Sequence, residues 1–101
     1  MFITITSGKV PSELSEKLEK FLQELLPKMR QLPGVRAIYH YSKPEAGEVK
    51  TIVIWEDEES IKAYREGELI KEAIAFEKEN NLSSTREIYP LTFSLGDNII
   101  S

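Results

Sequence analysis

The order in which strand-like and helix-like hydrophobic patterns follow one another limits the fold of this chain most. Four stretches are rich in β-branched and apolar residues and end at turn residues, which is typical of strands: residues 2–6, 35–41, 49–56 and about 85–95. Apolar residues at helical spacing fill residues 12–29 and 57–80. The order is therefore βαββαβ, which predicts a ferredoxin-like α+β fold with a four-stranded antiparallel sheet. The length of 101 residues predicts a single domain over residues 1–101.

Residues at the element ends refine this outline. Ser12 is a possible N-cap of the first helix, and Pro27 should kink that helix because its ring meets a carbonyl of the preceding turn. Asp57 is the expected cap of the second helix, which Gly67 should break or bend. Pro90 in the last strand suits an edge position or a bulge.

The sheet is expected to have an apolar face that no helix covers. With both helices on one face, a monomer would make the other face polar. Residues 51–55 instead place apolar groups on both faces, and the second strand offers Val35, Tyr39 and Tyr41 on one face and Ile38 on the other. We therefore expect a homodimer in which the two sheets cover each other.

The composition argues against several kinds of protein. A net charge of −4 with scattered basic residues argues against nucleic acid as a partner. The absence of cysteine excludes disulfides, a thiolate nucleophile and cysteine-bound metals. No apolar run suits a signal peptide or approaches the ~20 residues that span a bilayer, so we expect a cytoplasmic protein without membrane contact. Fifteen Glu against two Asp, with nine Lys, is a tendency of thermophile proteins.

Several short segments resemble a known family. They are Pro33-Gly34-Val35 before the second strand, residues 49–55 within the third, Asp57-Glu58-Glu59-Ser60 at the start of the second helix, and Tyr64-Arg65-Glu66-Gly67 further along it. With the βαββαβ order, residues 2–93 resemble the antibiotic biosynthesis monooxygenase (ABM) domain family of the dimeric α/β-barrel superfamily. That resemblance implies a dimeric α/β barrel.

The resemblance also bears on cofactors. The family includes cofactor-free oxygenases of phenols and quinols, haem-degrading monooxygenases, and proteins of no known activity. The haem-degrading branch has a Trp and, ten residues later, a His on the second helix, with an Asn on the first strand. Those helix positions fall here at Tyr64 and Ile74, and the first Asn of the chain is Asn80. The resemblance therefore implies no haem breakdown, and we expect no cofactor.

Few residues are candidates for chemistry. His40, the only histidine, and Tyr64 are candidate catalytic residues, while Tyr39, Trp55 and Tyr64 are candidate ligand-binding residues. A lone strand histidine more often packs through hydrogen bonds, and Trp55 suits a core position equally well. Tyr89 follows the same logic as Tyr64 with less support. A metal site is not expected, because no second histidine exists and Asp is rare.

Three functions stay open from the sequence. The first is a cofactor-independent monooxygenase acting on a small aromatic or quinol substrate, in a pocket between the sheet and the second helix. The second is a non-catalytic small-ligand-binding or stress-related dimer. The third is an isomerase or lyase on the same scaffold. Whether the chain is an enzyme at all is thus left open at this stage.

Overall fold

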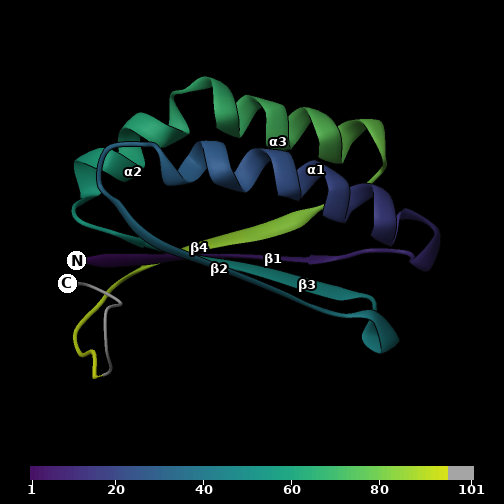
Figure 1. Cartoon of the computed structure of the whole chain (residues 1–101), viewed down its shortest axis with the longest axis horizontal. Helices are drawn as coiled ribbons and strands as arrows, with labels where there is room; N and C mark the ends of the chain where they lie inside the picture. Colours follow the sequence, from purple (N-terminus) through teal and green to yellow (C-terminus); the bar gives the residue numbers. More distant parts are fainter. Residues whose placement is uncertain (96–101) are drawn as a thin grey trace.

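A computed structural model describes residues 1–95 (Figure 1). Its elements are β1 (Phe2–Lys9), α1 (Ser12–Arg30), β2 (Val35–Lys43), the short 3₁₀ helix η1 (Pro44–Ala46), β3 (Glu48–Trp55), α2 (Glu58–Arg65), α3 (Glu68–Glu79) and β4 (Ser84–Pro90). The strands form one antiparallel sheet in the order β2-β3-β1-β4, and the α-helices lie together on one of its faces (Figure 1). The predicted ferredoxin-like α+β fold is confirmed.

The strand ends differ from the predicted ones. β1 continues through the expected turn at Ser7 and Gly8, because both residues pair with β3 on one side and β4 on the other. The last strand stops at Pro90 and does not reach residue 95. Since β4 is an edge strand, the edge position predicted from Pro90 is confirmed.

The first helix does not use the predicted cap. Pro11, with φ −59° and ψ 147°, takes the cap position without a side-chain bond, so Ser12 is already helical and its prediction as the cap was wrong. Because Pro11 has the extended backbone of a cap residue, the helix begins at Ser12, one residue earlier than predicted. Pro27 lies within α1, which continues to Arg30 as one helix.

The second helical region is divided as expected. Asp57 caps α2: its Oδ1 accepts hydrogen bonds from the backbone N–H and the hydroxyl of Ser60, each at 2.8 Å. Both bonds hold the pKa of the Asp57 carboxyl below its usual value. Gly67 separates α2 from α3, and α3 ends at Asn80, whose side chain donates to the carbonyl of Phe76 at 2.8 Å.

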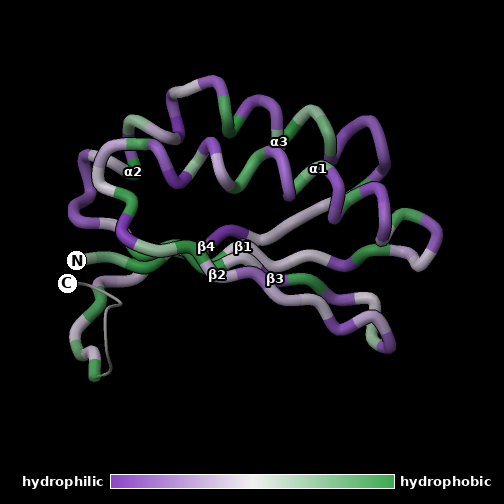
Figure 2. Tube along the Cα trace, viewed as in Figure 1, coloured by the Kyte–Doolittle hydropathy of each residue, from purple (hydrophilic) through white to green (hydrophobic). Residues whose placement is uncertain are grey.

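The core lies between the helices and the sheet. Figure 2 shows hydrophobic residues recurring along α1 and α3 between hydrophilic ones, the pattern of helices with one apolar side. The central cluster combines residues of α1, β2, β3 and α2: Leu25, Met29, Val35, Val53, Trp55 and Ile61. Trp55 is fully buried, and its indole Nε1 donates to Thr4 Oγ1 at 2.9 Å. This cluster fixes β3 beneath α1 and α2.

A β-bulge shifts the alternation of β2. Val35 pairs with Trp55 and Ala37 pairs with Ile54, which leaves Arg36 as the extra residue. Val35 is therefore buried against the helices, and its predicted placement on the same face as Tyr39 was wrong. From Ala37 onward, odd-numbered residues face away from the helices.

Candidate functional site

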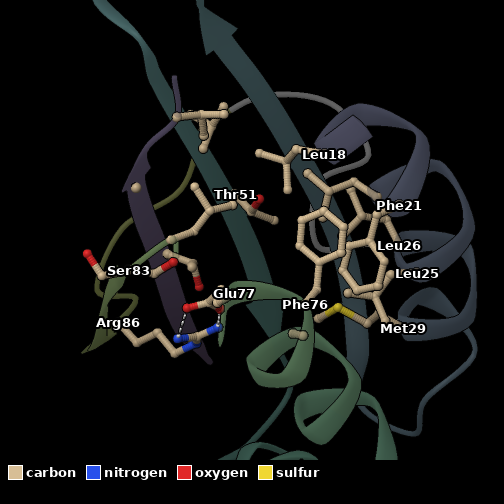
Figure 3. Close-up of a pocket in the computed structure, with 18 of the residues that line it drawn as sticks. Leu18, Phe21, Leu25, Leu26, Met29, Thr51, Phe76, Glu77, Ser83 and Arg86 are labelled. Carbon is tan, nitrogen blue, oxygen red and sulfur yellow. Dashed lines mark hydrogen bonds and ion pairs between the residues drawn. The ribbon is translucent and has the colours of Figure 1, made fainter. Parts of the chain in front are cut away.

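A cavity of about 100 Å³ lies between the sheet and the helices α1 and α3 (Figure 3). Its strand side is partly polar, because Thr4 and Thr6 of β1 and Thr51 of β3 occupy helix-facing positions beside the valines of β3. A single buried water needs roughly 10–15 Å³ measured in this way, so the space exceeds that of one water several times. Threonine is a short side chain, and three of them at helix-facing positions leave room above the sheet.

The helix side of the cavity is apolar and aromatic. Phe21 of α1 and Phe76 of α3 stack with ring centroids 4.2 Å apart and an angle of 13° between the rings. Leu18 and Leu25 extend this wall along α1 (Figure 3). A wall of flat rings suits a flat apolar molecule.

One ion pair forms the polar edge of the cavity. The two terminal nitrogens of the Arg86 guanidinium donate to Glu77 carboxylate oxygens, Nη2 at 2.5 Å and Nη1 at 3.4 Å, and join β4 to α3 (Figure 3). The side chains are only 32% and 17% exposed, so this pair is held more firmly than a surface pair. It brings a fixed, locally neutral set of donors and acceptors to the cavity.

Tyr64 lies at the same cavity, on the last turn of α2. Its ring centroid is 5.5 Å from that of Trp55 at an angle of 40°. Burial raises the pKa of the Tyr64 hydroxyl, a rise that Arg86 opposes and Glu77 increases. Tyrosine is protonated near neutral pH even at its ordinary pKa of about 10, so the hydroxyl is available as a hydrogen-bond donor.

The other predicted site residues lie outside the cavity wall. Trp55 is a core residue that does not line the cavity itself and contacts two residues that do, Thr4 and Tyr64. Tyr39 and Tyr89 are on the face of the sheet without helices, each 47% exposed. Tyr89 donates to Glu87 at 2.5 Å, and this bond raises the pKa of its hydroxyl. The structure thus brings Tyr64 and Trp55 together and separates both from Tyr39.

His40 lies on the helix-facing side of β2, next to the cavity. Its Nδ1 is 2.9 Å from Thr51 Oγ1, and its Nε2 is 3.0 Å from Glu19 Oε2 on α1. The His40 side chain is 15% exposed. Only Thr51 of these three residues lines the cavity.

Sequence reasoning missed Arg86, Glu77 and the threonines. Thr4 and Thr6 carry a detectable signal, since they alternate with Ile3 and Ile5 and polar residues at core-facing positions are unusual. Predicting Arg86 as a site residue requires the strand order, because only the pairing of β4 with β1 places it opposite Thr6.

The positions considered for haem and for metal ions can be located in the structure. Ile74, at the position of the haem-branch histidine, is 39% exposed on α3. Within residues 1–95, no group of three His, Asp or Glu side chains could hold a metal ion. No helix in that part of the chain is long and apolar enough to cross a membrane.

The fold and site define a class: a ferredoxin-like α+β protein with a small, partly polar cavity under its helices. The sequence model of the family described as "Antibiotic biosynthesis monooxygenase" matches residues 1–75, so the chain belongs to that family. A search of curated proteins found no match.

Solved structures repeat the fold at low sequence identity. A Deinococcus radiodurans protein assigned as an antibiotic biosynthesis monooxygenase has a TM-score of 0.86 at 15% identity, covering 95% of this chain and 97% of its own. SnoaB, a cofactor-independent oxygenase from Streptomyces nogalater, has a TM-score of 0.78 at 12% identity, covering 95% and 97%. MhuD, solved with manganese protoporphyrin IX, has a TM-score of 0.72 at 17% identity, covering 95% and 99%. At such identities the likeness shows the fold alone.

Proposed function

We propose that this chain is a cofactor-independent monooxygenase whose cavity takes a small aromatic or quinol substrate. The observation that carries the proposal is that an aromatic wall, Phe21 and Phe76, and a hydroxyl donor, Tyr64, line the same cavity. The rings would hold a flat substrate, and the hydroxyl would orient its oxygen. The fold shared with the oxygenase SnoaB supports this choice.

The chemistry asks little of the protein. A deprotonated quinol can itself pass electrons to oxygen, so the chain need supply only a dry pocket, oriented donors and a proton acceptor. The apolar wall from α1 and α3 limits water. Tyr64 provides the oriented donor beside the ion pair of Arg86 and Glu77.

A second candidate, a non-catalytic ligand-binding dimer, has one observation in its favour. The charged pair at the cavity, Arg86 and Glu77, is already engaged in a two-point contact. A cavity whose charges bind each other suits holding a neutral ligand as well as transforming one.

The proposal includes a homodimer formed through the face without helices. The strand register puts a band of half-buried isoleucines and exposed tyrosines there: Ile3, Ile5, Tyr39, Tyr41, Ile52 and Tyr89. After β4 the chain passes to this side of the sheet, and Phe93 and Leu95 are 76% and 82% exposed (Figure 1). An exposed apolar band of this kind suits burial against a second sheet.

The test compares Tyr64→Phe with the matched control Tyr89→Phe, in which the lost hydroxyl is remote from the cavity. Binding of a quinol panel is followed by the fluorescence of Trp55, the only tryptophan, which contacts Tyr64. Oxygen uptake is measured with the same panel. We expect Tyr64→Phe to weaken binding and uptake by about tenfold, the value of one buried hydrogen bond, and Tyr89→Phe to leave both unchanged.

The outcomes separate the two candidates. Binding without oxygen uptake would favour the ligand-binding dimer. No quenching by any quinol would rule out the cavity as an aromatic site. Equal behaviour of the two variants would return Tyr64 to a packing role.

A further inference from the structure

Three side chains form a continuous hydrogen-bonded chain from the surface of α1 to the cavity. Glu19 Oε2 lies 3.0 Å from His40 Nε2, and His40 Nδ1 lies 2.9 Å from Thr51 Oγ1. Glu19 is 35% exposed at its side chain and His40 15%, while Thr51 lines the cavity. The chain therefore joins solvent to the substrate space through an imidazole.

The partners determine the tautomer of the histidine. An ionised Glu19 can only accept, so Nε2 carries the hydrogen, and the Nδ1 of a neutral His40 is then an acceptor. Thr51 must donate its hydroxyl hydrogen to that nitrogen. A carboxylate, an imidazole and a hydroxyl in this order form an arrangement that can take up a proton at the hydroxyl end.

We propose that Glu19, His40 and Thr51 form a proton-accepting relay for the cavity, selecting substrates with an ionisable phenol hydroxyl. As the phenol gives its proton to Thr51 Oγ1, the hydrogen of Thr51 moves to His40 Nδ1. The products are a phenolate, a neutral Thr51 and an imidazolium that donates to the Glu19 carboxylate. Thr51 is the catalytic residue, and His40 and Glu19 act through it. The proposal rests on the proposed function, since it supplies the proton acceptor which that function needs.

The surroundings leave Glu19 as the charged partner in contact with His40. Arg30 and Arg36 border the same shallow groove outside β2. Arg30 donates to the carbonyl of Val35 at 3.1 Å, and Arg36 lies 4.0 Å from Glu56. Among these charged groups, Glu19 is the one whose carboxylate lies at hydrogen-bond distance from the imidazole.

The first measurement needs no ligand. Nitrogen NMR shifts of the histidine ring in the intact protein report which nitrogen carries hydrogen, and His40 is the only histidine. We expect the Nε2–H tautomer. Finding the Nδ1–H tautomer would overturn the relay, whatever the cavity binds.

The second measurement uses p-nitrophenol, whose anion absorbs visible light. At a pH below the pKa of the free phenol, we expect the bound ligand to show the anion spectrum. Thr51→Val and Glu19→Gln should lower the ionisation constant of bound nitrophenol by about tenfold, the effect of one charge-assisted hydrogen bond. The matched controls are Thr85→Val, on the opposite face of the sheet, and Glu16→Gln, on the exposed side of α1.

Three outcomes have separate meanings. Loss of the anion signal in the relay variants but not in the controls, with native circular dichroism throughout, supports the relay. Binding with an equal anion fraction in all variants overturns the relay and leaves the aromatic site intact. Absence of Trp55 quenching in the wild type overturns the proposed site and, with it, the relay.

Discussion

Gly34 is the position at which a single methyl group should destabilise this fold most clearly. Its φ is +85°, and a Cβ added there would lie 2.0 Å from Ser60 Oγ and 2.5 Å from Ser60 Cβ. Ser60 cannot easily move, because its backbone N–H and its hydroxyl both donate to Asp57. The carbonyl of Gly34 also accepts the N–H of Glu56 at 2.7 Å, so this bond ties the turn before β2 to the residue that follows β3.

The expected cost of Gly34→Ala has two parts. A left-handed conformation costs a non-glycine residue about 1–2 kcal/mol, and forced overpacking costs about 1–3 kcal/mol more. The sum is about 2–5 kcal/mol of unfolding free energy, a large share of the ~5–15 kcal/mol of a typical domain. In a Ser60→Gly background the overpacking disappears, so the same substitution should cost only about 1–2 kcal/mol.

Urea unfolding followed by Trp55 fluorescence measures these free energies. An unchanged slope of unfolding free energy against urea concentration would show that each variant exposes the same surface on unfolding. Gly47→Ala is the matched control: its φ is +64°, and the nearest atom to an added Cβ is the carbonyl oxygen of Val10 at 3.0 Å. It should carry mainly the left-handed cost. The reasoning fails if Gly34→Ala costs no more than Gly47→Ala, or costs the same with and without the Ser60 side chain.

Three further predictions concern titration, assembly and haem. Burial raises the pKa of Tyr64, so above about pH 10 the unfolded chain loses this proton first, and unfolding free energy should fall as pH rises. Alkaline urea titrations should show a shallower fall in Tyr64→Phe; an identical slope would contradict the assignment. Light scattering at micromolar concentration should give twice the chain mass, from an interface above ~1,000 Å², and Tyr39→Glu should shift it toward one chain. A wild-type mass of one chain would end the dimer proposal. Added haem should show no axial-histidine spectrum, since Ile74 occupies the histidine position; steady haem turnover would show that this alignment is wrong.

Sequence patterns predicted the architecture well because they report local physics. Alternation and helical spacing identify strands and helices. Asp57 starts α2 and Gly67 separates α2 from α3 through effects on residues next to them in the sequence. The family resemblance, confirmed over residues 1–75, added the frame in which these elements pack. Errors fell at ends such as Ser12, where a one-residue difference in backbone conformation decides the cap.

The site was harder to predict, because it depends on contacts between distant residues. Glu77 meets Arg86 across α3 and β4, and Glu19 meets His40 across α1 and β2. No spacing along the chain encodes these contacts. Tyr64 was accessible to prediction since the resemblance gave it a helix position beside the pocket.

The bulge at Arg36 determines which side chains of β2 face the helices and which face the open side of the sheet. Without it, strict alternation from the buried Val35 would turn Tyr39 and Tyr41 toward the helices and His40 toward the open face. Deleting Arg36 would remove the bulge and leave every pair from Ala37 onward as it is, whereas a regular strand that kept Arg36 in the ladder would move the histidine out of the interior and the tyrosines off the outer surface. The one extra residue at position 36 therefore sets both the interior position of His40 and the outward position of the two tyrosines.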